Sequence, residues 1–327
     1  MSQLRADPTA GYAPFPLETD AAALGLTETT VFWHDRRLHA AAPDDRQAIR
    51  AVARHRPART STRATILLHG AAGSWTTWTP LLAAAERAGV TIVNPVIVDL
   101  PGWGDATGDP GAAPPTLDAV SELVRDTALE LGYTEWDVVG HSLGGFIALH
   151  MASTWPQSVL SVSLVSGTTW SVIESVAHPW RGLRVIPGFV LLRFFLRLLA
   201  PVQAVAIVAV SALQAAGIMR LVAFPLFRHV ARVHDSVIKA LSTELRPRSF
   251  VAASEVTRGY DADTRWAAIE CEVRATRGDR DVFVTQGDLD RLAATVPRAI
   301  TTVVPDCGHF GNVERPLEVL RALGYLG

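Results

Sequence analysis

The most informative segment of the chain reads Asp137-Val138-Val139-Gly140-His141-Ser142-Leu143-Gly144-Gly145-Phe146. A short apolar run passes into a glycine-punctuated turn and then into an apolar segment with helical spacing. This order predicts a buried strand, a tight reversal and a helix. So tight a reversal needs neighbours of Ser142 with almost no side chain, and Gly140 and Gly144 meet this requirement. The reversal would raise Ser142 above the sheet edge and place the amide N–H of Leu143 to bind a developing oxyanion.

A second glycine-rich loop follows the buried strand predicted at residues 64–68 and reads His69-Gly70-Ala71-Ala72-Gly73. Its plain structural interpretation is an ordinary strand-to-helix turn. A phosphate-binding loop is excluded because the segment has no Gly-Lys-Ser/Thr ending. The strand predicted at 91–98 leads into Asp99-Leu100-Pro101-Gly102-Trp103-Gly104-Asp105. We expect its two carboxylates to hold backbone amides in the turn rather than to act in catalysis.

Two polar turns lie near the C-terminus. The first, Gly278-Asp279-Arg280-Asp281, follows a strand predicted at 271–276. The second, Gly308-His309-Phe310, follows a last strand predicted at 299–304 and precedes Glu314-Arg315-Pro316. His309 is a candidate catalytic base. The structural alternative is that it is a turn residue whose hydrogen bonds are satisfied and which has no catalytic role.

In combination, these motifs resemble those of the α/β-hydrolase superfamily, from about Thr30 to the C-terminus. The resemblance implies an α/β fold with a mostly parallel central sheet flanked by helices. It also implies a catalytic triad in the chain order Ser142, Asp281, His309, which act as nucleophile, orienting acid and general base. Such a triad requires no metal and no cofactor.

The identity of the acid depends on a spacing. The Gly-x-x-Asp spacing that begins at Gly278 favours Asp281, and Asp279 remains a close competitor. The superfamily has a second acid position after its sixth strand. Here that position holds Ser166-Gly167-Thr168, which contains no carboxylate. The acid is therefore expected on the later turn.

The resemblance assigns further roles by position. The amides of Ala71 and Leu143 would form the oxyanion hole that binds the negative oxygen of a tetrahedral intermediate. The residues that support the two glycine-rich motifs are His69, Gly70, Gly140, His141 and Gly144. Four aromatic residues near the motifs are candidates for the wall of a substrate pocket: Trp75, Trp103, Trp170 and Phe310.

The strand–helix alternation divides the chain. We expect an N-terminal arm, a first core part, a helical lid inserted after the sixth strand, and a second core part: residues 1–28, 29–168, 169–250 and 251–327. The first core part would begin with two antiparallel strands, 29–34 and 48–54, which flank a turn at 42–45. The lid is assigned because several prolines interrupt long apolar runs there without strand spacing.

One apolar stretch of the lid, 198–219, carries no formal charge and is long enough to span a bilayer. A transmembrane helix is disfavoured here by Pro201, by Gln203 and by the alanine-rich composition. Such a helix would also separate the two core parts. We therefore expect a buried or substrate-facing lid helix, with a membrane-touching lid as the alternative. A hydrophobic dimer interface would explain the same composition.

Bulk composition excludes several classes. Hydrophobic residues make up 49% of the 327 positions and charged residues 19%, which suffices for a large core. The net charge of −2 gives no reason to expect a nucleic-acid partner. Cys271 and Cys307 form no metal-ligand spacing and are expected to be buried. The segment 1–16 has no apolar core typical of a secretion signal, so a cytoplasmic location is the default expectation.

The sequence therefore predicts a serine hydrolase that cleaves a small apolar carboxylic ester through an acyl-enzyme. Three serine-triad chemistries remain open: C–C bond hydrolysis, acyl transfer and lactone hydrolysis. Outside catalysis, a slow-turnover ligand-binding protein of the same fold is the alternative. An aspartate would be required at position 142 for the related dehalogenases and epoxide hydrolases, and this chain has Ser142. The sequence makes no prediction of oligomeric state.

Overall fold

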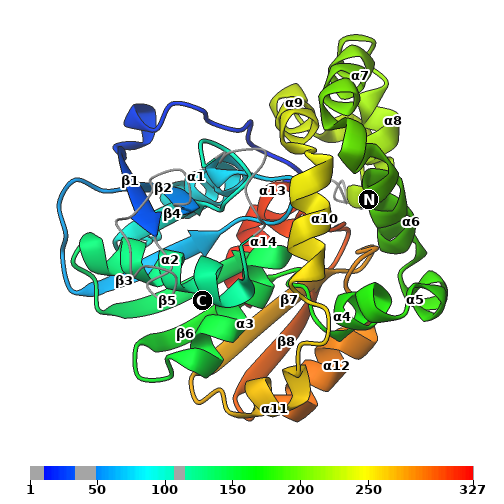
Figure 1. Cartoon of the computed structure of the whole chain (residues 1–327). Helices are drawn as coiled ribbons and strands as arrows, with labels where there is room; N and C mark the ends of the chain where they lie inside the picture. Colours follow the sequence, from blue (N-terminus) through cyan, green and yellow to red (C-terminus); the bar gives the residue numbers. More distant parts are fainter. Residues whose placement is uncertain (1–10, 34–48, 107–114, 327) are drawn as a thin grey trace, which may run out of the picture.

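The computed structural model describes residues 11–33, 49–106 and 115–326. An eight-stranded sheet runs through the molecule in the order β1-β2-β4-β3-β5-β6-β7-β8 (Figure 1). β2 pairs antiparallel with β1 and with β4, and the remaining neighbours are parallel. The strands are β1 (Thr27–Trp33), β2 (Ile49–His55), β3 (Arg63–Leu68), β4 (Pro95–Asp99), β5 (Glu135–His141), β6 (Val159–Val165), β7 (Glu272–Gly278) and β8 (Ala299–Val304).

Helices cover both faces of this sheet, so its central strands are apolar on both sides. Along β3, Ile66 and Leu68 belong to one apolar cluster and Leu67 to the other, because successive side chains point to opposite faces. The first cluster is closed by α2 (Leu117–Glu130), α3 (Leu143–Thr154), α11 (Ala262–Ala267) and α12 (Gln286–Thr295). The second is closed by α1 (Thr79–Arg87), α14 (Pro316–Ala322) and η3 (Trp75–Trp78). Two short helical turns, η1 (Ala22–Leu24) and α13 (Gly311–Glu314), complete this part of the fold. The predicted α/β architecture is confirmed.

A helix-rich insertion follows β6, as predicted. Its elements are α4 (Trp170–Ala177), α5 (Pro179–Val185), α6 (Pro187–Leu199), η4 (Ala200–Val202), α7 (Gln203–Ala215), α8 (Met219–Ala223), η5 (Phe224–Leu226), η6 (Val230–Arg232), α9 (Asp235–Glu244) and α10 (Pro247–Glu255). Prolines start α5, α6 and α10, where a missing N–H costs nothing. The boundary expected at residue 250 falls inside α10. We keep the name lid for residues 169–250.

The expectation of a buried helix in the apolar stretch is wrong for α7, in which Ala206 is the one buried residue. Pro187–Ala215 is long and apolar enough to cross a membrane, with a mean hydropathy of 2.0, and 11% of its most apolar window is buried. The η4 turn, which contains Pro201, interrupts this stretch. α7 packs mainly against α9, with smaller contacts to α8 and α10, and most of its side chains are exposed. In Figure 1 it stands at the outer end of the lid.

The N-terminal arm lies against the lid. Tyr12 and Leu17 are buried in an apolar cluster with Phe227, Val233 and Val237. The amide of Leu17 also donates to the Ser236 hydroxyl at 3.0 Å. The first ten residues of the expected arm and the turn predicted at 42–45 lie outside the described residues.

The close packing of the Ser142 turn against β3 leads to a stability prediction. A Cβ at Gly144 would overlap the backbone carbonyl of Leu68, which belongs to a central strand and cannot yield. Gly144→Ala should therefore lower the free energy of unfolding by about 1–3 kcal/mol in urea titrations. The matched control is Gly287→Ala in α12, where a Cβ would meet only the Thr285 hydroxyl at 3.6 Å. That variant should be as stable as the wild type or up to about 1 kcal/mol more stable. Equal effects of the two substitutions would contradict this packing.

Candidate active site

Ser142 occupies a strained turn between β5 and α3. Its φ is 50° and its ψ is −116°, a conformation that a residue with a side chain rarely adopts. The backbone around it is held on both sides, because its amide donates to the Val165 carbonyl at 3.1 Å and its carbonyl accepts the Thr168 amide at 2.9 Å. A Cβ at Gly140 would overlap the backbone at Gly144. Both glycines are therefore required by the close approach of the strand and the helix, as the sequence predicted.

Asp281 and His309 form a buried pair between the loops that follow β7 and β8. His309 Nδ1 lies 2.9 Å from Asp281 Oδ1, and the two side chains are 3% and 0% exposed. The same carboxylate oxygen accepts the amides of Phe283 at 2.9 Å and Val284 at 3.1 Å, which fix its orientation. Because Nδ1 donates to a carboxylate, the proton resides there and Nε2 remains the basic atom of the ring.

The charge of this pair follows from its surroundings. Burial by itself raises the pKa of the Asp281 carboxyl. The charge of His309 and the hydrogen bonds from His309 and the Phe283 amide outweigh burial, so that the pKa lies below its ordinary value. Asp281 is therefore ionised at neutral pH and can stabilise a positively charged imidazole.

Asp279, the competing acid, has a different position. It is exposed, and its Oδ1 accepts the amide of Cys307 at 3.0 Å. It thereby ties the end of β7 to the loop that carries His309. The geometry brings Asp281, and not Asp279, into contact with His309.

Glu314 organises the histidine loop, a role that the sequence prediction did not assign. Its Oε2 accepts the Tyr12 hydroxyl at 2.6 Å and the amides of Arg228 and Gly308 at 2.8 and 2.9 Å. Its Oε1 accepts the Phe310 amide at 3.1 Å. Burial raises the pKa of the Glu314 carboxyl, and the four donors act against this shift. One buried carboxylate thus joins the N-terminal arm, the lid and both neighbours of His309.

Both residues whose amides are expected to bind an oxyanion, Ala71 and Leu143, line the same cavity as Ser142. Leu143 is the first residue of α3, so its N–H has no carbonyl partner within the helix. Ala71 follows β3 and lines the same cavity as Leu143. Its loop is fixed by the ring of His69, which contacts the Gly70 carbonyl through Nδ1 at 2.7 Å and accepts the Leu100 amide at Nε2 at 2.9 Å. Burial lowers the pKa of His69, so the ring is neutral and structural.

His141 also has a structural position. Its Nε2 lies 3.1 Å from the backbone oxygen of His309, and the ring is buried. Burial and the neighbouring His309 lower the pKa of His141 to about 3. A Cβ at Gly70 would lie 2.7 Å from the His141 ring, which explains the glycine at that position. The neutral ring therefore spaces the oxyanion loop from the histidine loop.

The carboxylates of the turn after β4 differ from each other. Asp99 holds the turn as predicted, since it accepts the amides of Trp75 at 2.7 Å and Asp105 at 3.0 Å. The side chain of Asp105 pairs with the buried Arg54, which also contacts Asp99, and it accepts no amide from the described residues. Neither carboxylate is among the residues that line the cavity at Ser142.

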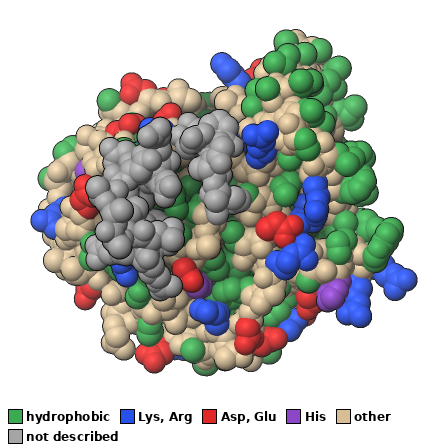
Figure 2. Space-filling view, in the orientation of Figure 1, with side chains coloured by type: hydrophobic (Ala, Val, Ile, Leu, Met, Phe, Trp, Pro, Cys, Tyr) green, Lys and Arg blue, Asp and Glu red, His purple; other side chains and the backbone are tan. Residues whose placement is uncertain are grey.

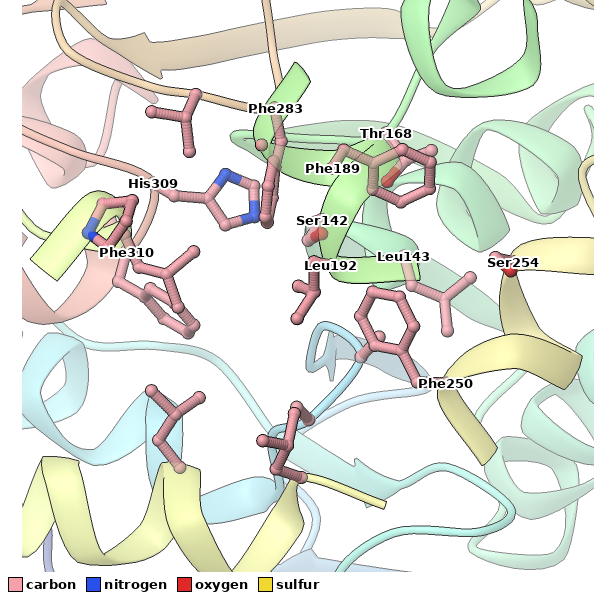
Figure 3. A pocket seen from close by; sticks show the side chains of 18 of the residues that line it. Ser142, Leu143, Thr168, Phe189, Leu192, Phe250, Ser254, Phe283, His309 and Phe310 are labelled. Atoms are coloured by element: carbon pink, nitrogen blue, oxygen red, sulfur yellow. The ribbon is translucent and has the colours of Figure 1, made fainter. Parts of the chain in front are cut away.

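A cavity of about 170 Å³ lies at Ser142, between the core loops and the lid. Figure 3 shows the imidazole of His309 directed toward Ser142 and phenyl rings around them. Five lining residues are polar: Ser142, Thr168, Ser254, Thr257 and His309. The rest are apolar: Ala71, Ala72, Leu143, Val172, Gly188, Phe189, Leu192, Met219, Val222, Ala223, Pro225, Leu226, Leu241, Leu245, Phe250, Ala253, Val282, Phe283 and Phe310.

The expectation of a pocket wall built from tryptophans is wrong for three of the four aromatic candidates. Trp75 is buried in the apolar cluster of the second sheet face, and Trp103 packs edge-on against His69. Trp170 packs against Trp266 and donates its indole N–H to Asp263 at 3.0 Å. These large rings are buried against the core side of their turns rather than under the lid. Phe310 does line the cavity.

Lid residues supply much of the wall that sequence reasoning missed. Phe189 and Leu192 come from α6 and Phe250 from α10. In α6 the buried residues are Phe189, Arg193 and Leu196, an i, i+4, i+7 stripe. That spacing is a signal in the sequence, although the apolar residues on the opposite side of α6 conceal it.

No metal site accompanies this arrangement within residues 11–33, 49–106 and 115–326, where no group of three His, Cys, Asp or Glu side chains could hold an ion. Cys271 and Cys307 are buried free thiols, as expected.

The two candidate acids can be separated by labelling Ser142 with a fluorophosphonate, which reports an activated serine without assuming a substrate. Asp281→Asn should slow labelling by roughly 10³- to 10⁴-fold, because the amide no longer stabilises the imidazolium or fixes its tautomer. Asp279→Asn retains an oxygen that can accept the Cys307 amide and should label at the wild-type rate. The opposite order of rates would reassign the acid to Asp279.

The hydrogen bonds of Glu314 predict that its substitution lowers the stability of the protein. In Glu314→Gln an amide NH₂ must face a backbone or hydroxyl donor, so at least one donor stays unsatisfied. We expect the free energy of unfolding to fall by about 1–3 kcal/mol and serine labelling to slow. Glu318→Gln in α14 is the control, since Glu318 is partly exposed and its ion pair with Arg321 is long, at 3.8 Å. Wild-type stability of Glu314→Gln would contradict the role assigned to this carboxylate.

Comparison with known proteins places this geometry in a family. The chain matches the model of the alpha/beta hydrolase family over residues 65–322. It is similar to the pimeloyl-[acyl-carrier protein] methyl ester esterase of Aromatoleum aromaticum, with 30% identity over 263 residues, 77% of this chain and 92% of that protein. It is also similar to the 2-hydroxy-6-oxononadienedioate/2-hydroxy-6-oxononatrienedioate hydrolase of Paraburkholderia phymatum, with 30% identity over 128 residues. That second match covers 38% of this chain and spans less than half, 42%, of that relative.

Among solved structures, a thermophilic esterase from Thermogutta terrifontis superimposes with a TM-score of 0.58 and 19% identity, covering 84% of this chain and 92% of that chain. At this identity the likeness shows a shared fold. The family match extends from β3 to α14 and includes the turns that carry Ser142, Asp281 and His309. This chain therefore belongs to the alpha/beta hydrolase family.

Proposed function

We propose that this chain is a carboxylic-ester hydrolase that acts on an uncharged, apolar substrate through an acyl-enzyme. The observation that carries the proposal is an apolar cavity into which Ser142 and His309 project, with Asp281 hydrogen-bonded behind His309. The similarity over most of its length to a relative named as a methyl ester esterase supports the same reaction class.

The proposed reaction follows from the positions of these groups. His309 Nε2 takes the proton of the Ser142 hydroxyl while the serine oxygen attacks the ester carbonyl. The amides of Ala71 and Leu143 bind the oxyanion that forms, and one such donor contributes about 3–4 kcal/mol in comparable sites. His309 then gives its proton to the leaving alkoxide. Water, deprotonated by the same histidine, hydrolyses the acyl-enzyme and releases the acid.

The cavity wall favours this reaction over hydrolysis of a C–C bond in a dicarboxylate. The name of one relative describes a dioate substrate, which carries two negative charges. Among the described lining residues of this cavity there is no lysine or arginine, and His309 is engaged by Asp281. A carboxylate moved from water into such a wall would have no counter-charge and would be strongly disfavoured.

Turnover of nitrophenyl esters with acyl chains of increasing length tests the proposal. An apolar cavity of about 150 Å³ is known to hold benzene, so kcat/KM should rise from the acetate toward an acyl chain of about six carbons. Ser142→Ala should lower turnover by roughly 10⁴-fold or more and abolish fluorophosphonate labelling. The matched control is Ser161→Ala, a partly exposed strand serine that bonds Asp137.

The outcomes separate the alternatives. Labelling of Ser142 without turnover of any ester would reject ester hydrolysis and indicate an activated serine that acts on another bond or acceptor. Hydrolysis of a C–C bond in an unsaturated dicarboxylate, at a rate above that of ester hydrolysis, would reject the proposed substrate class. Absence of both labelling and turnover would favour a ligand-binding protein.

A further inference from the structure

The lid exposes a large apolar surface. Of the 22 large hydrophobic side chains that are exposed in the described part of the chain, 16 lie between Trp180 and Phe224. They include Phe194, Phe195 and Leu198 on α6, each more than half exposed, and Val208 on α7, which is 69% exposed. Figure 2 shows these hydrophobic side chains over the α7 lobe and along the adjoining edge of the molecule. We call the exposed hydrophobic side chains of residues 180–224 the lid patch. Soluble proteins rarely leave so many apolar groups contiguous and exposed without a partner.

On α6 the patch is a continuous stripe. With 3.6 residues per turn, Phe194, Phe195 and Leu198 fall on the side opposite the buried Phe189 and Leu196. The helix is therefore apolar on two sides, one that closes the active-site cavity and one that faces outward. Only the first side has a partner within the described fold.

The formal charge of the sequence around the lid patch is positive, although Arg193, Arg220 and Arg228 pair with Glu255, Asp235 and Asp306. Residues 175–234 contain seven arginines and no aspartate or glutamate, although the whole chain has a net charge of −2. Arg181, Arg184 and Arg197 are exposed and belong to α5 and α6, at the border of the patch. An apolar surface bordered by arginines fits the boundary between acyl chains and anionic headgroups.

One mouth of the active-site cavity borders the lid patch. Val222 lines the cavity and is also 49% exposed, and the neighbouring Pro225 likewise lines the cavity and is exposed. This rim is fastened to the catalytic loop, because the Leu226 carbonyl accepts the His309 amide at 2.9 Å and the Arg228 amide donates to Glu314. A surface docked on the patch would therefore cover the mouth that leads to Ser142.

From these observations we propose that the lid patch docks on the surface of an anionic lipid bilayer, so that an apolar ester can pass from the bilayer into the cavity. α6 and α7 have 13 residues each, about 20 Å of helix, which is shorter than the roughly 30 Å hydrocarbon core. They would lie in the interface rather than cross it. A second copy of the chain is a poorer occupant, because it would bring two arginine-rich segments together and close both cavity mouths.

The delivery of substrate rests on the proposed esterase function, whereas docking itself does not. Docking is therefore measured with the full chain carrying Ser142→Ala, by flotation with vesicles of phosphatidylcholine alone or mixed with phosphatidylglycerol. We expect strong binding to the mixed vesicles, weaker binding to phosphatidylcholine, and a decrease when salt rises from about 0.1 M to about 1 M.

Variants then assign the binding to the patch. Phe194→Gln with Leu198→Gln should lower the partition coefficient by about tenfold or more, because two apolar groups no longer enter the interface. The matched control is Leu129→Gln with Ile300→Gln, which removes two exposed apolar groups from α2 and β8 and should bind like the parent. When the two double variants are made in the chain that keeps Ser142, both should hydrolyse a short soluble ester at the wild-type rate. This activity checks that they fold.

Three results would overturn docking. The first is absence of binding to mixed vesicles. The second is vesicle binding that survives the α6 substitutions but is lost when Arg181, Arg184 and Arg197 become glutamine, which would indicate electrostatic adsorption of the arginines to the headgroups without insertion of the lid patch. The third is a dimer without vesicle affinity that the α6 variant converts to a monomer. Vesicle binding without ester turnover would refute the proposed function and leave docking intact, and turnover without binding would do the reverse.

Discussion

The backbone of Ser142 is the constraint on which the rest of the site depends. A positive φ in a residue with a side chain costs on the order of 1–3 kcal/mol, and it persists only where the surroundings impose it. Here β6 and the loop after it hold the amide and the carbonyl of Ser142. β3 approaches so closely that Gly144 has no room for a methyl group. The apolar clusters on both sheet faces thus supply the energy that keeps one serine in a strained position.

The loops that carry Ser142 and His309 are held by buried histidines and carboxylates. His69 and His141 are buried, and burial lowers the pKa of both rings, so neither competes with His309 for a proton near neutral pH. Asp281 remains ionised because three donors converge on one oxygen. Glu314 bonds the two residues beside His309 and reaches the arm and the lid. Displacement of any of these segments would therefore change the position of His309.

The lid has two apolar surfaces, one that faces the cavity and one that faces outward. Its inner side completes a cavity whose described lining contains no lysine, arginine, aspartate or glutamate. Its outer side leaves an apolar, arginine-bordered surface beside the cavity mouth. A helix that is apolar all round is normally buried, and α7 has too few neighbours to achieve this within the described fold. The cavity and the exterior of the lid are both apolar. This agrees with the proposal that the substrate and the surface on which the lid docks belong to the same lipid bilayer.

The sequence by itself determined the α/β alternation, the order of the central strands along the chain and the turns of Ser142 and His309. These features rest on local patterns: strand-length apolar runs, glycines at a tight reversal and polar residues at strand ends. Tertiary structure decided what depends on contacts between distant segments. Asp281 and Asp279 share one turn, and the spacing favoured Asp281 without excluding Asp279. The position of His309, which follows the next strand, separates the two carboxylates. Likewise, apolar residues such as Trp103, Phe189 and Val208 look alike in sequence, whereas one is in the core, one lines the cavity and one is exposed. Burial is a property of the partners a side chain meets, and those partners are far away along the chain.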